Sequence, residues 1–192
     1  MQKELVTLKQ EELMIIFPEI AEIKGKKLKE LTVKALLVAI DKGGWHSQNI
    51  SKAPVTMNWK TSCTLIEHIR KVTQACIADY NILNKFYKEN GVEFDRDTVI
   101  CGALLHDIGK FTEFSLKGGK VIHSENSNLM RHPLSGAIIA AGAGLPDKIV
   151  HLIATHSFEG EKSNQTAESY FVRSIDDFVF KCTVYGLPKI TK

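Results

Sequence analysis

Residues 99–108 constrain the fold most, because they are apolar on almost every face of the helix that they are expected to form. A helix without a polar side has to be surrounded by other elements, so we place it at the centre of a bundle. Its last turn carries His106 and Asp107, whose burial is costly without a compensating partner. A divalent cation is one such partner, since neutral imidazole and ionised carboxylate both donate electron pairs to it. A hydrogen-bonded core pair or a helix-end carboxylate is the alternative.

Helical patterns on both sides of this segment predict that most of the chain is α-helical. Apolar residues recur every three or four positions in six further stretches, which are 3–16, 26–41, 61–90, 132–141, 147–156 and 167–183. Gly118-Gly119 lies between short apolar and charged stretches and predicts a hairpin. The expected fold class is therefore all-α, a helical bundle with a small hairpin insertion near residues 111–123.

Length and composition favour one domain. The 192 residues include 44% hydrophobic and 24% charged residues, and no repeat, low-complexity segment or linker divides them. We expect a single domain over residues 1–192, in which N-terminal helices and a loop at 1–60 pack on a core at 61–184. The net charge of +3 predicts no strong nucleic-acid footprint, although it leaves an anionic substrate open.

Four cysteines are widely spaced and form no C-x-x-C pair, which argues against a zinc knuckle or a redox motif. The N-terminal residues lack the long apolar core of a signal peptide, and no apolar run approaches the length of a bilayer crossing. We therefore expect a cytoplasmic protein without a membrane partner. The oligomeric state is left open.

Four more side chains of metal-ligand type lie at ends or on buried stripes of other predicted helices. His68 shares the apolar stripe of the longest helix, and His132 precedes a proline at a helix start. His156 ends its helix beside a polar loop. Asp176 adjoins the apolar stripe of the last helix, whereas Asp177 is expected to be solvated. Each histidine alone is equally well explained as a hydrogen-bonded core residue.

Together these side chains make a set that is more specific than any member. Four imidazoles and two carboxylates suffice for two first-row metal ions, with the carboxylate beside His106 as a natural bridge. The candidate ligands are His68, His106, Asp107, His132, His156 and Asp176.

Three further histidines are ambiguous. The segment 43–60 is a long loop that carries Trp45 and His46, and long loops in compact domains are often functional. Either these two side chains reach a substrate, or the tryptophan is buried and pins a surface loop. His123 and His151 are interpreted as structural.

The ordered set resembles the HD-domain superfamily of metal-dependent phosphohydrolases, whose signature is H…HD…D with further histidines in binuclear members. The resemblance covers residues 61–184 and includes Leu105-His106-Asp107-Ile108-Gly109-Lys110 and Ser174-Ile175-Asp176-Asp177. It implies an all-α HD-domain bundle with the metals at its centre. The stretch Thr155-His156-Ser157-Phe158-Glu159-Gly160 lacks the G-Y-P tripeptide of members that hydrolyse cyclic dinucleotides, which disfavours that branch.

This resemblance also implies a reaction. The expected enzyme is a phosphomonoesterase or phosphodiesterase that acts on a nucleotide, an RNA end or another small phosphorylated substrate. Its cofactors would be divalent metal ions, two in number, drawn from Mn, Fe, Co, Ni or Mg, which activate a water that Asp107 orients. Lys110 is expected to hold a phosphate oxygen, and Arg131 is a second substrate-binding candidate. A solvated helix-end cation is the alternative for Lys110.

Two other functions use the same ligands. Some HD proteins hold a di-iron pair and activate dioxygen, and this ligand set suits iron as well as manganese. A nucleotide-sensing or scaffold module with a structural metal is the third possibility, against which the full ligand set argues. The pocket is expected to be lined by loops 43–60, 111–131 and 157–166, none of which contains a base-reading or sugar-reading motif.

Overall fold

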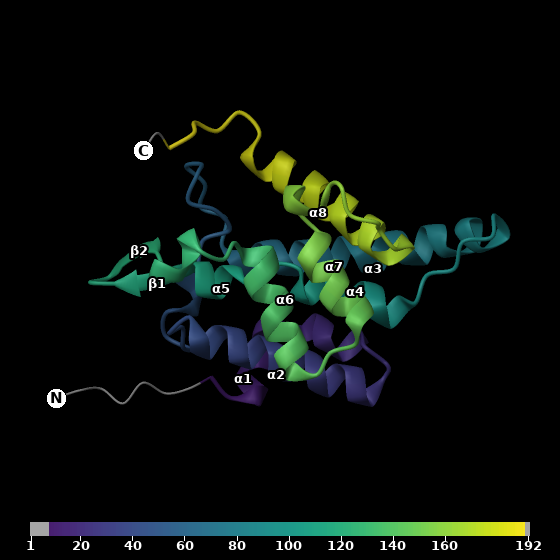
Figure 1. Cartoon of the computed structure of the whole chain (residues 1–192), viewed down its shortest axis with the longest axis horizontal. Coiled ribbons are helices and arrows are strands. Elements are labelled where there is room, and N and C mark those ends of the chain that lie inside the picture. Colours follow the sequence, from purple (N-terminus) through teal and green to yellow (C-terminus); the bar gives the residue numbers. More distant parts are fainter. Residues whose placement is uncertain (1–7, 191–192) are drawn as a thin grey trace.

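The central element of the fold is helix α4 (Arg96–Leu105), eight of whose ten residues are buried. The computed structural model describes residues 8–190, and in it α4 contacts four other helices (Figure 1). These are α2 (Lys26–Lys42), α3 (Leu65–Glu89), α7 (Asp147–Thr155) and α8 (Ala167–Val184). Their apolar stripes cover the all-round apolar surface of α4, as the sequence pattern predicts.

The remaining elements are short, apart from helix α6 (His132–Ala143), which packs on α7 and α2. In chain order they are α1 (Gln10–Ile16), α5 (Lys110–Glu113), β1 (Phe114–Lys117), β2 (Lys120–His123) and α6 (His132–Ala143). Single 3₁₀ turns lie at Pro18–Glu22, Ile50–Lys52, Glu125–Asn128 and Phe158–Gly160. The expected all-α class with one hairpin is confirmed.

Helix starts follow local capping chemistry. The helix expected over 61–90 begins only at Leu65, because the Thr64 hydroxyl accepts from the Glu67 amide while the Glu67 carboxylate accepts from the Thr64 amide. The helix expected over 3–16 begins at Gln10, and residues 3–7 of that prediction lie outside the described residues.

The hairpin pairs β1 with β2 in antiparallel register, with Phe114 opposite His123. Gly118 and Gly119 form its turn with φ values of 58° and 79°, a left-handed conformation at both positions that favours glycine. The hairpin projects from the side of the bundle (Figure 1). Its base joins the core through Phe114, which is 3% exposed, while its glycine turn lies outside the core.

Gly109 brings the turn after α4 into close contact with α6. A Cβ atom at this position would lie 2.0 Å from the carbonyl oxygen of His132 and 2.8 Å from the amide nitrogen of Gly136. Only a residue without a side chain allows this approach. The contact places the first residue of α6 beside Asp107.

Trp45, the first of two tryptophans in the segment 43–60, is buried and holds this loop in place. Trp45 is 3% exposed, and its indole N–H donates to the carbonyl oxygen of Phe111 at 2.8 Å. His46 bonds locally, with its Nε2 3.0 Å from Asn49 Nδ2. Of the two explanations for Trp45 and His46, burial of Trp45 is the one that the structure supports.

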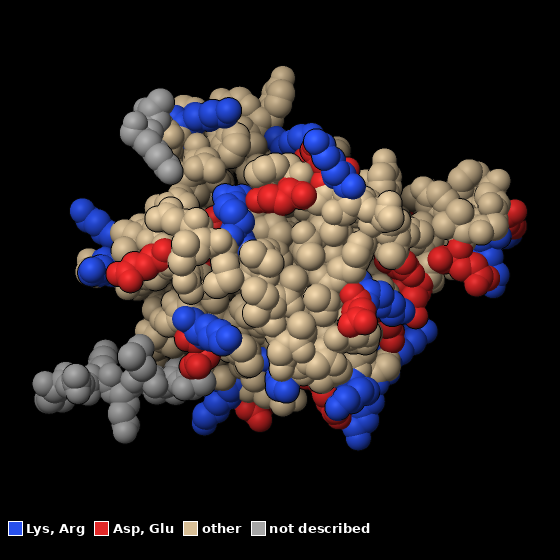
Figure 2. Space-filling model, viewed as in Figure 1, with Lys and Arg blue, Asp and Glu red and all other residues tan. Residues whose placement is uncertain are grey.

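Charged side chains of both signs are distributed around the edge of the face seen in Figure 2, and the area over α6 and α7 is largely uncharged. This mixed pattern agrees with the small net charge of +3. Among the described helices, none has both the length and the apolar character required to cross a membrane.

Candidate metal centre

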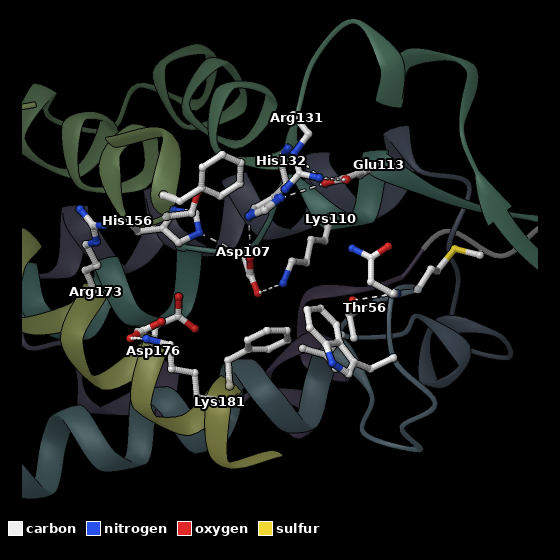
Figure 3. A pocket seen from close by; sticks show the side chains of 18 of the residues that line it. Thr56, Asp107, Lys110, Glu113, Arg131, His132, His156, Arg173, Asp176 and Lys181 are labelled. Atoms are coloured by element: carbon white, nitrogen blue, oxygen red, sulfur yellow. Dashed lines mark hydrogen bonds and ion pairs between the residues drawn. The ribbon is translucent and has the colours of Figure 1, made fainter. Parts of the chain in front are cut away.

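The structure brings all six predicted ligand side chains together beside the C-terminal end of α4. They come from five elements: His68 from the first turn of α3, His106 and Asp107 from the end of α4, His132 from the start of α6, His156 from the end of α7 and Asp176 from the middle of α8. Figure 3 shows four of them, Asp107, His132, His156 and Asp176, around one pocket. Five of the six residues are buried, and the side chain of Asp176 is 15% exposed.

The Asp107 carboxylate lies between two pairs of imidazoles. Its Oδ2 is 3.4 Å from His68 Nε2 and 3.5 Å from His106 Nε2. Its Oδ1 is 3.4 Å from His132 Nε2 and 3.6 Å from His156 Nε2. In each triad that Asp107 forms with one pair, the ligand atoms lie within 4.8 Å of one another. This geometry suits two ions bridged by one carboxylate.

Asp176 completes the first of these groups. Its Oδ1 lies 2.9 Å from His68 Nε2 and 3.5 Å from His106 Nε2. The neighbouring Asp177 points elsewhere and forms a surface ion pair with Lys181 at 2.6 Å. The first group therefore contains two carboxylates, and the second contains one.

Hydrogen bonds at Nδ1 orient three of the four imidazoles. Nδ1 of His106 and Nδ1 of His156 each donate to a main-chain carbonyl oxygen at 2.7 Å, those of Ala103 and Ile153. Nδ1 of His132 donates to Glu113 Oε2 at 2.9 Å. A neutral imidazole that donates through Nδ1 keeps the lone pair on Nε2, so these rings direct lone pairs toward Asp107.

His68 Nε2 lies within hydrogen-bond distance of Asp176 Oδ1, but the acceptors at the centre of the cluster are only partly satisfied. His68 Nε2 and His106 Nε2 face each other at 3.3 Å. Asp107 Oδ1 is buried and has no hydrogen-bond partner among the described residues. Buried acceptors are normally satisfied, and a divalent cation would satisfy these. The donor set therefore fits a metal.

Charges in the cluster bias the protonation of its members. Burial opposes ionisation of Asp107, but Lys110 and His106 outweigh it and hold the pKa of this carboxyl well below its ordinary value. Burial opposes protonation of His106 as well, but Asp176 and Asp107 raise its pKa to about 10, so a bound cation would have to displace a proton from His106 Nε2. Burial lowers the pKa of His132 to about 4, despite Glu113. The bridging carboxylate is thus anionic near neutral pH.

Lys110 lies at the floor of the pocket. Its Nζ is 2.7 Å from Asp107 Oδ2, and its side chain is only 12% exposed. The side chains of these two residues point toward each other in Figure 3. A solvated helix-end cation, the alternative that the sequence left open, does not describe this side chain.

Glu113 is a residue of the site that the sequence did not single out. It is 4% exposed and accepts from His132 Nδ1, from the His132 amide at 3.2 Å and from Arg131 Nη1 at 3.3 Å. Arg131 also donates through Nε to Glu159 Oε1 at 3.1 Å. No periodic pattern surrounds Glu113 in the sequence, because it ends a single helical turn and directly precedes the hairpin.

A pocket of about 850 Å³ opens over the cluster, and each of the three expected loops contributes to its lining. Residues 55–59 line it from the first loop, although Trp45 and His46 do not. His123 lies on its wall, whereas His151 does not. Its cationic lining residues are Lys110, Arg131, Arg173 and Lys181.

Comparison of the sequence with known proteins finds a matching family model and a curated relative. The sequence model of the HD domain matches residues 65–180, more than half of the chain. A curated protein of Methanocaldococcus jannaschii, dihydroneopterin 2′,3′-cyclic phosphate phosphodiesterase, is 29% identical over 133 residues, which cover 67% of this chain and 52% of that protein. The chain thus spans about half the length of this relative. No solved structure matches.

Proposed function

We propose that this chain, which belongs to the HD-domain family, is a metal-dependent phosphohydrolase. The observation that carries the proposal is the position of Asp107, whose two oxygens face separate pairs of imidazoles at 3.4–3.6 Å. The side chains that would hold one ion are His68, His106, Asp107 and Asp176, and those for a second are Asp107, His132 and His156. Divalent ions bound there would supply an activated water nucleophile and withdraw charge from phosphoryl oxygens.

The residues of this chain have three tasks in that reaction. Asp107 is buried and anionic, so it holds a fixed negative charge at the point where the nucleophilic water has to be oriented. The ammonium group of Lys110, already 2.7 Å from that carboxylate, binds a phosphate oxygen and stabilises the charge that it gains. Arg131 lines the pocket with a half-exposed guanidinium and binds a polar group of the substrate.

We propose that the substrate is a small phosphoester, and that a 2′,3′-cyclic phosphate is the form to test first. The support is the name of the curated relative, a dihydroneopterin 2′,3′-cyclic phosphate phosphodiesterase, together with the ammonium group of Lys110 on the pocket wall beside the candidate metal centre. Hydrolysis breaks one P–O bond of the cyclic ester, adds a hydroxyl to phosphorus and returns a proton to the released oxygen. Nucleotides and RNA ends carry the same group.

We also propose that residues 1–192 act as one domain. An apolar cluster runs without interruption from Leu8 through α2 and α4 to Ile153 in α7, which supports a shared core. The cysteines Cys63, Cys76, Cys101 and Cys182 are all free, in keeping with the reducing cytoplasm that we propose as its location.

The experiment is an assay of purified protein loaded separately with Mn²⁺, Fe²⁺, Co²⁺, Ni²⁺ or Mg²⁺. The substrates are 2′,3′-cyclic nucleotides, 3′,5′-cyclic nucleotides, phosphomonoesters and short RNA with a cyclic phosphate end. We expect at least one of them to be hydrolysed only in the presence of metal. Oxygen uptake by the iron form on an organic alcohol or acid, without hydrolysis of any phosphoester, would instead support the oxygenase alternative.

A further inference from the structure

One wall of the pocket is assembled from segments that are far apart in the sequence. Residues 188–190, which we call the C-terminal strap, pair with the loop that ends at Lys60. The Lys60 amide donates to the carbonyl oxygen of Pro188 at 3.1 Å, and the Ile190 amide donates to that of Asn58 at 2.9 Å. Trp59 and Lys189 form an antiparallel bridge between these bonds. The strap therefore fixes the backbone of a pocket-lining residue, Trp59.

The indole of Trp59 is held on two sides. Lys189 Nζ lies 5.3 Å from the ring centroid, a cation–π distance. The ring of Phe180 on α8 meets the indole edge to face, with centroids 5.7 Å apart and planes at 85°. These contacts define one position for an otherwise half-buried side chain on the pocket wall.

Phe180 connects this wall to the candidate metal centre. Its ring centroid is 6.2 Å from that of His68, and Lys110 Nζ lies 5.7 Å from the ring. The indole of Trp59 is therefore separated from the cluster by one aromatic ring. A small molecule whose phosphate is bound beside Lys110 has its organic group within reach of Trp59.

The rest of the pocket matches an organic group that is planar. Phe158 lines it as well, is 66% exposed, and lies 5.9 Å from the Arg131 guanidinium. A large exposed aromatic side chain on a pocket wall is available to contact a ligand ring. Thr56 and Asn58 add polar side chains to the wall that carries Trp59. Aromatic surfaces around a cationic floor suit an anion joined to a heteroaromatic ring.

Resting on the proposed function, we propose that Trp59 is a specificity-determining residue that binds the heteroaromatic ring of the group esterified to the phosphate. The substrate class is then phosphate esters of nucleoside-like or pterin-like molecules rather than aliphatic phosphate esters. The strap keeps the indole in place. Because every such ring has a π face, Trp59 selects for the presence of a ring more than for its identity.

The kinetic test compares a cyclic phosphate that carries a ring with one that does not. Substrates are 2′,3′-cyclic AMP and glycerol 1,2-cyclic phosphate, and variants are Trp59→Ala, Trp59→Phe and Phe178→Ala. Phe178 is the control, since it is 67% exposed on the helix of Phe180 but does not line the pocket. We expect Trp59→Ala to raise KM for the adenine substrate about 10-fold and to leave the glycerol substrate unchanged. Trp59→Phe should retain most of the affinity.

A binding test reads out the same contact without turnover. The protein has two tryptophans, and Trp45 is buried, with 3% of its surface exposed and its indole N–H bonded to the Phe111 carbonyl oxygen. A bound ring therefore changes chiefly the fluorescence emission of Trp59. We expect 3′-AMP to quench the emission of the wild type, glycerol 2-phosphate to leave it unchanged, and Trp59→Phe to abolish the quenching.

Equal effects of Trp59→Ala on both cyclic substrates, or equal quenching in Trp59→Phe and the wild type, would overturn the role of Trp59. If neither cyclic phosphate is hydrolysed, the proposed function is wrong for these substrates, and the fluorescence titration alone decides the role of Trp59. The two proposals can therefore fail separately.

Discussion

Asp107 is the residue on which both candidate ion sites depend, because each of its oxygens belongs to a different group of imidazoles. We expect Asp107→Ala to lower bound manganese from about two ions per chain to one or none and to reduce hydrolysis by roughly 1,000-fold. Elemental analysis of dialysed protein measures the first effect. Asp41→Ala is the matched control, since Asp41 is an exposed carboxylate that does not line the pocket. Unchanged metal content in Asp107→Ala would show that the ions bind elsewhere.

Glu113 acts on the cluster through His132, and its effect should therefore be confined to one ion. Glu113→Gln keeps the size of the side chain but removes the negative charge that His132 Nδ1 and Arg131 contact. Loss of such a partner typically weakens metal binding, and we expect a factor of about 10 for the ion beside His132 and His156. Manganese titration followed by electron spin resonance measures both affinities.

The control for this substitution is Glu93→Gln, since the side chain of Glu93 is 75% exposed and does not line the pocket. Equal weakening of both ions would mean that Glu113 supports the whole cluster rather than the orientation of His132.

For single residues, the sequence predicted most side chains of the candidate metal centre. His68 was recognisable because it lies on an apolar stripe, and His106, His132 and His156 because they lie at helix ends. Glu113 and Trp59 carried no comparable signal. Their contacts depend on where the hairpin and the strap fold back, which the sequence pattern around each residue does not encode.

The close packing of the turn between α4 and α5 against α6 depends on Gly109. A Cβ there would overlap the His132 carbonyl oxygen, so Gly109→Ala has to separate the turn from α6. We expect the free energy of unfolding to fall by roughly 2–4 kcal/mol, as measured by urea denaturation. Gly142→Ala is the control on α6, since a Cβ at Gly142 meets no atom within 4 Å, and it should be neutral or slightly stabilising. Equal stability of Gly109→Ala and the wild type would contradict this close packing.

The strap is a backbone element, so its contribution can be tested by removing one N–H group. Ile190→Pro deletes the donor that bonds to the Asn58 carbonyl, while Ile190→Ala retains it. We expect the proline variant to expose Trp59 to acrylamide and to raise KM for 2′,3′-cyclic AMP several-fold, whereas the alanine variant should resemble the wild type. Identical quenching in the two variants would mean that Trp59 is positioned without the strap.

Elements differ in how well local sequence predicts them. The long helices and the hairpin follow from periodicity and from Gly118-Gly119, and the structure confirms them, whereas the short helix α5 occupies residues that were expected in the hairpin insertion. The pairing of residues 58–60 with residues 188–190 joins segments about 130 positions apart, and neither has a strand-like pattern of its own. Such a contact is decided by the packing of α8 against α3, which places both segments at one end of the bundle.

For the whole molecule, the buried central helix explains why a cluster of polar ligands can exist in a small protein. Helices α2, α3, α7 and α8 surround α4. His106 and Asp107, at the end of α4, therefore lie in a site largely shielded from water, where they meet the ligands of the other helices. Low exposure strengthens every charge interaction there, but it also makes an uncompensated set of acceptors unfavourable. We therefore expect metal binding and catalysis to depend on the same fold-wide packing.

The most direct test of the central proposal is a metal titration of the hydrolysis of 2′,3′-cyclic AMP by metal-free protein. We expect no hydrolysis without metal and a rate that rises until about two equivalents of Mn²⁺ are bound, with 2′-AMP or 3′-AMP as product and no uptake of oxygen. Hydrolysis that persists at full rate after exhaustive chelation, or that is unchanged in Asp107→Ala, would contradict it.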